Sequence, residues 1–465
     1  PVPRRPCGRP LVNPRDRALE IATEACHVAS GDEVDALVHL ERSGFARFAG
    51  STVHQPTLIE DESVTIRVVR GGRVGASSTN RTDLDGLRAA ASRAAEAADN
   101  APPDPGFPGL PPPSAAPPVE GFDEETAALP PEEQADRAWS AIDAAPEYAL
   151  YGYFTSGVTE LAIASSTGLT AAQTMTDATI RALAASDGQS GYAEATSWRA
   201  GELDSAAVTR EAADKARRTK GASDFDAGVC RAVLEPYAVA ELLWYFAFTS
   251  LGALSLLEER GYLAGRIGEQ IFHPSFSLRD DGRDPRGLPK AFDFEGVPKQ
   301  PVTLIEEGVA RDVVWDRRTA ARAGRNSTGH ALAAPAQAHG PLPFNLVVHE
   351  GDATVDELIE RVEDGIYVTR LHYLNIVDPR EGLITGMTRD GTFRVEAGRV
   401  TRPLVNLRFT TSFPALVARL LGLSRELECV NLSDYYDERY PFAALVPALA
   451  TETFTIVGSG SGPGL

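Results

Sequence analysis

A proline-rich segment, residues 101–118, constrains the fold more than any other feature of this sequence. Proline has a fixed φ and no backbone N–H, so repeated prolines neither extend a β-ladder nor continue a helix. We therefore expect an extended surface connection between two folded units. The expected divisions are an N-terminal unit (1–100), a Pro-rich linker (101–121), a second unit (122–222), a C-terminal domain (223–457) and a flexible tail (458–465).

The N-terminal unit is expected to combine a helix, a small antiparallel sheet and a second helix. Apolar residues at helical spacing predict the first helix over residues 16–29, and Thr82 is placed to cap the second. Alternation of apolar and polar residues predicts the strands, and Gly71-Gly72 predicts a hairpin turn. The expected strands lie at residues 34–40, 46–48 and 53–59 and on both sides of the glycine pair within 64–75.

The rest of the chain mixes helices and strands without regular βαβ spacing. Helices are expected at residues 130–144, 205–220, 236–251, 354–364 and 414–423. Strands are expected at 150–154, 159–164, 174–183, 192–197 and 228–234, and hairpin turns at 306–308, 389–391 and 396–398. This order predicts an α+β fold, with an N-terminal α/β region of small antiparallel sheets flanked by helices and a β-rich C-terminal domain.

The charge balance excludes some classes of partner. Acidic side chains outnumber basic ones by 65 to 45, which gives a formal net charge of −20. Binding to a polyanion needs a basic face, so neither nucleic acid nor an anionic membrane is expected as a partner. No apolar run is long enough to cross a membrane, and no secretory signal is visible. The four cysteines form no CxxC pair, and a reduced, cytoplasmic protein is expected.

The residues alone indicate no reaction. No two of the eight histidines are four residues apart, so no helical turn offers a pair of imidazoles to a metal. His349-Glu350 resembles the start of a zinc-peptidase motif, but no histidine completes it, and we interpret it as a surface loop. The sequence contains no nucleophile elbow, phosphate-binding loop or dinucleotide fingerprint.

Several segments, taken in order, resemble the TldD/PmbA family. Residues 18–80 follow the order of elements in that family's first domain. In the C-terminal half, four family motifs have counterparts at Phe292–Pro298 (D-x-E-G-x-P), Leu304–Gly308 (L-I-E-x-G), Gly324–His330 (R-x-S-T/A-G-x) and Glu363–Thr369 (G-I/L-Y/F-V-T). The resemblance covers residues 15–457, and its strength comes from the order of motifs that are each weak.

The resemblance implies a subunit that lacks zinc. A TldD-type subunit of the family binds zinc through HExxxH on the apolar helix and through a cysteine near the C-terminus. In this chain Trp244 and Thr249 stand at the two histidine positions, and Tyr245 stands at the glutamate. Indole is no ligand, a threonine hydroxyl is a poor one, and a phenol is no base at neutral pH.

The cysteine ligand also lacks a counterpart. Cys429 lies too early in the chain, and Asp437 or Glu438 occupies the matching place. One alternative is a substitute metal site made by Glu241, one of these two acids and His330. The other is that aromatic side chains of the helix fill an apolar core where the zinc site would be. We favour the second alternative, which implies the PmbA (TldE) type, with no metal and no catalytic residue.

By this resemblance the chain is inactive alone and forms a heterodimer with a TldD-type zinc peptidase, which carries the zinc. The pair cleaves unfolded peptides, and an extended peptide binds a strand edge through main-chain hydrogen bonds. The candidate groove residues are Gly365, Ile366, Tyr367, Val368 and Thr369 on a strand and Arg325, Ser327, Thr328 and Gly329 in a loop. Two alternatives are a paralogue whose pair hydrolyses an amide or peptide bond in natural-product biosynthesis, and a binding or scaffolding protein without a hydrolytic partner.

Overall fold

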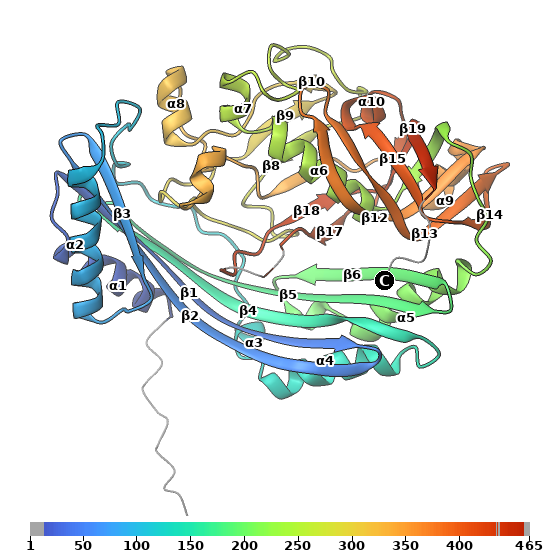
Figure 1. The fold of residues 1–465 in the computed structure, drawn as a ribbon, viewed down its shortest axis with the longest axis horizontal. Coiled ribbons are helices and arrows are strands. Elements are labelled where there is room, and N and C mark those ends of the chain that lie inside the picture. The colour runs from blue at the N-terminus through green and yellow to red at the C-terminus, as the bar shows by residue number, and fades with distance from the viewer. Residues whose placement is uncertain (1–13, 434, 436–437, 460–465) are drawn as a thin grey trace, which may run out of the picture. The chain divides into compact units, whose positions relative to one another are not determined.

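The computed structural model describes residues 14–433, 435 and 438–459, and it confirms the α+β class (Figure 1). The helices are α1 (Pro14–Val28), α2 (Leu84–Asn100), α3 (Glu124–Ala127), α4 (Pro131–Asp143), α5 (Ser205–Arg218), α6 (Pro236–Ser250), α7 (Ala253–Leu257), α8 (Arg317–Ala323), α9 (Val355–Val362) and α10 (Phe413–Ala418). Within the described residues, no helix is long and apolar enough to cross a membrane.

The strands form three sheets. The first, six-stranded, has the order β3 (Arg73–Thr79), β2 (Thr52–Arg70), β1 (Glu33–Ala49), β4 (Ala149–Ser165), β5 (Thr170–Ser186) and β6 (Gln189–Ser197). The second, also six-stranded, has the order β10 (Val309–Ala310), β9 (Val302–Glu306), β8 (Leu278–Asp280), β11 (Leu346–Val348), β18 (Ala443–Val446) and β17 (Glu428–Asn431). The third comprises β12 (Gly365–Asp378), β7 (Gly228–Leu234), β19 (Leu449–Ser459), β15 (Leu407–Ser412), β13 (Leu383–Glu396) and β14 (Arg399–Leu404), with β16 (Leu420–Leu423) paired to β19.

The described chain divides into two compact units, and the smaller one contains residues 14–41, 60–116 and 159–174. Its core is built from α1, α2 and the parts of β1, β2 and β4 that lie within it. Small alanines such as Ala22 and Ala94, both fully buried, allow the two helices to approach the sheet closely. Asp83 caps α2 by accepting a hydrogen bond from the backbone N–H of Gly86, so the prediction that Thr82 caps this helix was wrong.

The proline-rich segment forms neither helix nor strand, as its composition predicted. Within the smaller unit it is held at three points by backbone atoms. The N–H of Asp104 donates to the Gly72 carbonyl at 2.8 Å, and the N–H of Leu110 donates to the Glu33 carboxylate at 2.9 Å. The hydroxyl of Thr167 donates to the Pro111 carbonyl at 2.7 Å, so side chains and carbonyls satisfy a backbone that has no ladder partner.

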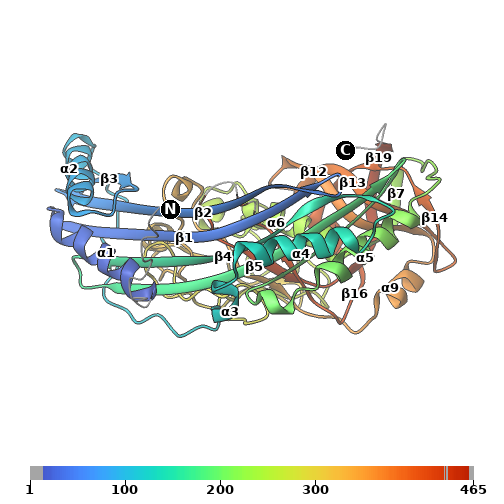
Figure 2. The ribbon, with the colours of Figure 1, turned by 90° about the horizontal axis from the view of Figure 1, so that it is seen from below.

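The larger unit contains residues 42–59, 117–158 and the described residues from 175 onward. Helices α4 and α5 lie side by side against its part of the first sheet, as Figure 2 shows, and a core rich in alanine, with larger side chains such as Phe48 and Phe154, fills the contact. Helix α6 lies in the largest apolar core, which the second and third sheets share. This helix is the element at which the resemblance places the zinc-binding motif of the family.

Other local predictions also differ from the structure. Residues 34–40 and 46–48 belong to one long strand, β1, and residues 150–154 and 159–164 belong to another, β4. Arg389–Gly391 forms no turn but lies within β13, where the pairing with β12 shifts by one residue. The helix predicted over residues 414–423 ends at Ala418, because residues 420–423 pair with β19. Of the predicted tail, residues 458–459 end β19 and residues 460–465 lie outside the described residues.

Candidate functional site

Helix α6 presents two different faces. Its first residue is Pro236, which suits a position where the backbone N–H has no partner within the helix. One face is fully buried in the core and includes Leu242, Leu243, Phe246 and Ala247. The other face keeps part of its surface exposed and includes Trp244, Tyr245, Phe248 and Thr249. The three positions that correspond to HExxxH therefore lie on the face that is open to the surface.

A cavity of about 360 Å³ lies beside this open face, and we call it the aromatic pocket. The rings that line it include Trp244, Phe248, Phe294, Phe344, Tyr440 and Phe442. The ring centre of Trp244 lies 4.9 Å from that of Phe442 and 5.8 Å from that of Phe344. Phe294 and Tyr440 are 4.5 Å apart, so the rings form a connected wall. These spacings are those of favourable aromatic pairs, which keep the rings in place around the cavity.

A second cavity of about 280 Å³ adjoins the first. Its lining includes Phe248 and His339, which also line the aromatic pocket, together with Thr249, Ser255 and Arg260. The rings of Phe248 and His339 lie 5.3 Å apart. Helix α6 thus borders two neighbouring cavities, one through Trp244 and one through Thr249.

A buried arginine fixes the segment that forms one wall of the aromatic pocket. The guanidinium of Arg439 donates two hydrogen bonds to Asp177, at 2.8 and 2.6 Å, and a third to the hydroxyl of Thr155 at 3.1 Å. A Cβ atom at Gly157 would lie 2.6 Å from Nε of Arg439, so glycine makes room for the guanidinium. This bidentate pair holds Tyr440 and the residues next to it against β5.

The α6 residues do not suit a zinc ion. The hydroxyl of Thr249 donates to the backbone carbonyls of Tyr245 and Phe246, at 3.2 and 3.1 Å, and is engaged within its own helix. Burial raises the pKa of the Tyr245 phenol, and the carboxylate of Glu241 raises it further, so the phenolate that could act as a base is still less populated at neutral pH. Among the residues that the structure describes, no three His, Cys, Asp or Glu side chains group in a way that could hold a metal.

The other candidates for a metal ligand lie apart. Burial raises the pKa of the Cys429 thiol to about 12, so the thiolate that zinc needs is disfavoured. Glu438 lines the aromatic pocket, whereas Asp437 lies outside the described residues. Burial raises the pKa of Glu241 to about 7, against the opposing effect of Arg370. A buried, partly neutral carboxyl is a poor ligand as well.

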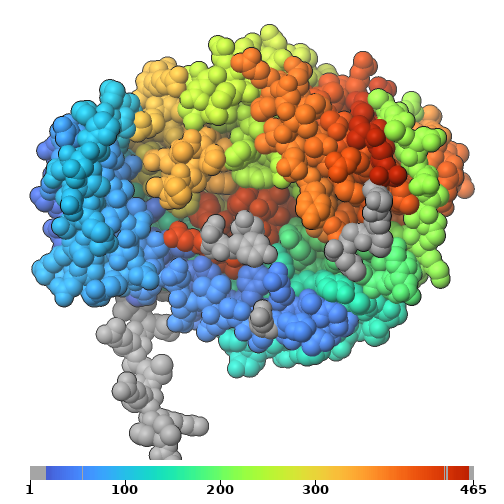
Figure 3. Space-filling model, in the orientation of Figure 1, coloured from blue at the N-terminus to red at the C-terminus, as the bar shows by residue number. Residues whose placement is uncertain are grey.

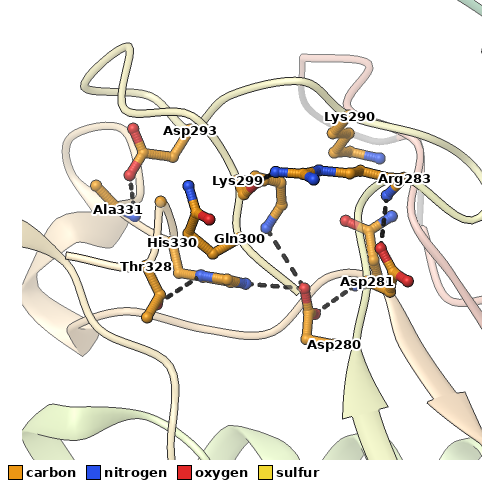
Figure 4. A network of polar contacts seen from close by, with 12 residues as sticks. Asp280, Asp281, Arg283, Lys290, Asp293, Lys299, Gln300, Thr328, His330 and Ala331 are labelled. Carbon is orange, nitrogen blue, oxygen red and sulfur yellow. Dashed lines mark hydrogen bonds and ion pairs between the residues drawn. The ribbon is translucent and has the colours of Figure 1, made fainter. Parts of the chain in front are cut away.

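His330 belongs to a buried network instead (Figure 4). Its Nε2 lies 2.8 Å from a carboxylate oxygen of Asp280, and its Nδ1 lies 2.9 Å from the hydroxyl of Thr328. The ammonium of Lys299 lies 3.7 Å from the same carboxylate. Burial lowers the pKa of His330, and Lys299 lowers it further, so both favour the neutral imidazole. Burial alone would raise the pKa of Asp280, but Lys299 and His330 outweigh it and lower that pKa.

The same network explains the motif at Phe292–Pro298. One carboxylate oxygen of Asp293 accepts hydrogen bonds from the N–H groups of Glu295 and Val297, each at 2.9 Å, and the other accepts from Ala331 at 2.8 Å. Aspartate in this motif therefore closes a turn and ties it to the chain next to His330. Burial nevertheless raises the pKa of Asp293 to about 6. The motif has a structural role that its residues alone did not indicate.

The candidate groove strand is buried, and all of it except Thr369 is paired on both sides. Gly365 to Val368 in β12 pair with β7 on one side and with β13 on the other, so both backbone edges are occupied. The hydroxyl of Tyr367 donates to Glu235, and that of Thr369 donates to the Gly391 carbonyl at 3.0 Å. Any contact between this segment and a peptide would need side chains or a rearranged edge, and a role in the groove stays a prediction.

The candidate groove loop is bonded to its surroundings but stays partly exposed. Arg325 donates to both carboxylate oxygens of Asp312, at 2.9 and 2.6 Å, and its guanidinium lies over the ring of Trp315. The hydroxyl of Ser327 donates to the Trp315 carbonyl at 3.1 Å, and Thr328 joins the network of His330. Gly329, with φ +77°, approaches the Pro298 backbone closely. These contacts stabilise the folded loop, and its participation in a substrate groove stays a prediction.

Sequence reasoning missed most of the aromatic pocket. Its walls come from α6, from residues between 332 and 344, and from Ser433, Tyr435 and the described residues 438–442, and no periodicity links these segments. A usable signal was the density of aromatic residues in Tyr435–Phe442, which is unusual for a surface turn.

Comparison with known proteins supports the resemblance. A family model described as the PmbA/TldA metallopeptidase C-terminal domain matches residues 227–458. A second model, described as PmbA/TldA metallopeptidase domain 1, matches residues 34–98. Together the two models cover more than half of the chain, and each matches the part of the chain where the corresponding motifs were found.

Individual relatives match over shorter segments. The chain is 33% identical over 131 residues to an uncharacterised protein of Methanocaldococcus jannaschii, which is 28% of this chain and 32% of that protein. It is 26% identical over 208 residues to a Haemophilus influenzae protein described as a metalloprotease TldD homolog, 43% of this chain and 42% of that protein. The chain thus spans less than half the length of these curated relatives.

The fold has a close match among solved structures. TldE from Thermococcus kodakarensis is 20% identical, with a TM-score of 0.84, and the match covers 94% of this chain and 99% of that one. At this identity the match shows a shared fold over nearly the whole chain.

Proposed function

Since the chain belongs to the PmbA/TldD metallopeptidase family, we propose that it is the metal-free subunit of a two-chain metallopeptidase that cleaves unfolded peptides. The partner is a TldD-type chain with an HExxxH helix, which holds the zinc and the catalytic carboxylate. This chain contributes part of the surface that binds the substrate.

The proposal rests on the side chains of helix α6 and on the cavities beside it. By the family resemblance the helix stands where the zinc-binding helix is expected, and its open face borders two cavities. The side chains on that face include Trp244, Tyr245 and Thr249, none of which suits zinc. A site that had lost its zinc and collapsed would have no cavity, but two cavities remain beside this helix. Recessed apolar surface that stays open is typical of a site that binds a ligand.

The partner requires an interface, and β12 offers apolar residues for it. Beyond the segment paired with β7, this strand has exposed apolar side chains at Tyr373, Ile376 and Val377, with 73% of Tyr373 and 52% of Val377 accessible. Figure 3 shows β12 and β13, coloured orange, at the surface on this face. Exposed apolar residues close together on one strand are typical of protein interfaces.

Co-expression tests the proposal directly. This chain is produced alone and together with a family member that contains HExxxH, and zinc content and peptidase activity are measured for each chain and for the pair. We expect no bound zinc and no activity for this chain alone, and zinc with activity for the pair. Stoichiometric zinc with peptidase activity on this chain alone contradicts the proposal.

Two variants sharpen the test. Thr249→Ala removes a hydroxyl that bonds only within its helix and neighbouring serine, and the zinc content of the pair should not change. Val377→Glu places a charge among the exposed apolar residues of β12 and should weaken the pair in size-exclusion chromatography. Glu132→Gln, at an exposed position of α4, is the matched surface control.

A further inference from the structure

We propose that the aromatic pocket binds an alkylated ammonium group, carried either by a small molecule or by a methylated side chain. The site goes beyond the proposed function, because this chain binds the cation by itself, with or without a hydrolytic partner. Its volume of about 360 Å³ is within the ~300–1,000 Å³ range of small-molecule pockets.

The walls supply the attraction. Trp244, Phe344 and Phe442 lie 4.8 to 5.8 Å apart, ring centre to ring centre, and Tyr440 continues the wall. The face of an aromatic ring carries negative electrostatic potential, so several rings around one cavity attract a cation, and tryptophan attracts it most strongly. Trp244 and Phe442 are only partly buried, so the wall they form retains surface that a ligand can reach.

The charge of the lining favours a cation over an anion. Among the described residues that border the pocket, Glu438 contributes a carboxylate, and neither lysine nor arginine is present. Lys290 lies outside the lining, with Nζ 4.8 Å from the ring centre of Tyr440. Its burial lowers its pKa to about 7, so at pH 8.5 this amine is mostly neutral and repels a bound cation little. The whole chain, at a formal net charge of −20, also attracts cations.

The scarcity of hydrogen-bond acceptors selects the type of cation. A primary ammonium has three N–H donors and a guanidinium has five, and each donor that is buried without an acceptor costs free energy. The lining is mainly aromatic and aliphatic, with Ser433 and Glu438 among its few oxygen-bearing side chains. A trimethylammonium group has no N–H and spreads its charge over methyl groups, so it enters such a pocket without leaving a donor unpaired.

The test compares a cation with a neutral molecule of the same shape. Choline and its carbon isostere 3,3-dimethyl-1-butanol are titrated into the full chain at pH 8.5, and binding is followed by calorimetry and by tryptophan fluorescence. We expect saturable binding of choline and at least tenfold weaker binding of the isostere. Equal or tighter binding of the isostere, or no saturable binding of choline, overturns the proposal.

Variants separate charge from shape. Trp244→Leu keeps an apolar side chain but removes the ring, and it should weaken choline about tenfold while changing the isostere little. Glu438→Gln should weaken choline several-fold, and Glu132→Gln, remote in sequence and exposed, should not. If Trp244→Leu fails to fold, the Glu438→Gln variant, at an exposed residue, still tests whether the charge of the lining contributes to choline binding. Unchanged choline affinity in Glu438→Gln and in every folded Trp244 variant overturns the proposal. A peptide with trimethyllysine, titrated in the same way, distinguishes the two carriers. Tighter binding of the peptide than of choline indicates a methylated side chain, and binding of choline alone indicates a small molecule.

Binding by this chain alone also keeps this proposal separate from the proposed function. If the chain does not bind choline but forms an active pair that contains zinc, only the proposal of a cation site is contradicted. Choline binding by a chain that forms no pair contradicts only the heterodimer.

Discussion

The indole ring of Trp244 lies 4.9 Å from the ring of Phe442, which joins helix α6 to a segment close to the C-terminal end of the chain. Where the family resemblance expects a zinc-binding histidine, the structure thus has one side of an aromatic cavity. The two rings line the cavity and are not packed on all sides. Trp244 should therefore contribute less to stability than its size suggests.

Alanine substitutions on the two faces of α6 test this assignment. Phe246 is fully buried, and Phe246→Ala should lower the free energy of unfolding by about 3–5 kcal/mol. Trp244 is only partly buried beside an existing cavity, so Trp244→Ala should cost about 1–2 kcal/mol, although tryptophan is larger. Denaturant unfolding of both variants measures the difference. Equal losses would show that Trp244 is a core residue and that the cavity has no open wall.

The pair of Arg439 and Asp177 should be essential for the wall opposite α6. Both side chains are almost fully buried, and Arg439→Met leaves the Asp177 carboxylate buried without its cation. Removal of one partner of a buried pair costs about 3–5 kcal/mol. The variant should lose that much in denaturant unfolding and should also bind choline more weakly.

Arg419→Met provides the matched control for this variant. The side chain of Arg419 is 70% exposed and lies 3.9 Å from Glu452, a separation at which an exposed ion pair contributes less than about 1 kcal/mol. Similar small losses in the two arginine variants would refute the anchoring role of Arg439.

The sequence predicted best those elements whose structure depends mainly on local interactions. The proline-rich segment, helix α6 and helix α9, which begins after its N-cap Thr354, follow from local rules. The long strand β1 did not, since residues 34–40 and 46–48 on either side of Gly44 were expected as two separate strands. A Cβ atom there would collide with the Gln134 amide, so glycine in β1 makes room for a side chain of α4.

Non-local pairing explains the other differences. Asp390-Gly391 has the composition of a hairpin turn, yet Asp390 at φ +57° and Gly391 at φ +137° lie within β13, where the register with β12 shifts. Thr369 of β12 bonds the carbonyls there, a contact that no local pattern encodes. The aromatic pocket was unpredictable for the same reason, since Trp244, Phe344 and Phe442 meet only in the folded chain.

The carboxylate of Asp280 should be the most sensitive position of the buried network. It is the counter-charge of Lys299 and bonds His330, and its second oxygen accepts from the backbone N–H of Asn345 at 2.8 Å. Asp280→Asn keeps the shape but removes the carboxylate charge beside the Lys299 ammonium, and we expect a loss of about 3–5 kcal/mol in denaturant unfolding. Asp281→Asn, one residue later and partly exposed, should cost less than about 1 kcal/mol. Comparable losses at the two positions would disprove the special role of Asp280.

Lys290 should give the protein a distinct pH dependence of stability. Its buried ammonium donates to the backbone carbonyls of Leu288 and Pro441, at 3.1 and 2.5 Å, yet burial lowers its pKa from 10.5 to about 7. Between pH 7 and 10.5 the unfolded chain therefore binds more protons at this lysine than the folded chain does. The free energy of unfolding rises with pH in that window, by up to about 1.4 kcal/mol per pH unit.

Lys290→Met removes this dependence, and the difference between wild type and variant isolates it, because contributions of other groups largely cancel. Relative to the variant, the wild type should gain stability from pH 7 to pH 10 and should show a constant difference below pH 7. Denaturant unfolding at several pH values measures this slope. Lys220→Met, at an exposed lysine that follows α5, makes the same change of charge at the surface and is the matched control. A flat difference for Lys290→Met would mean that the ammonium stays charged in the folded protein, with the two carbonyls compensating for its burial.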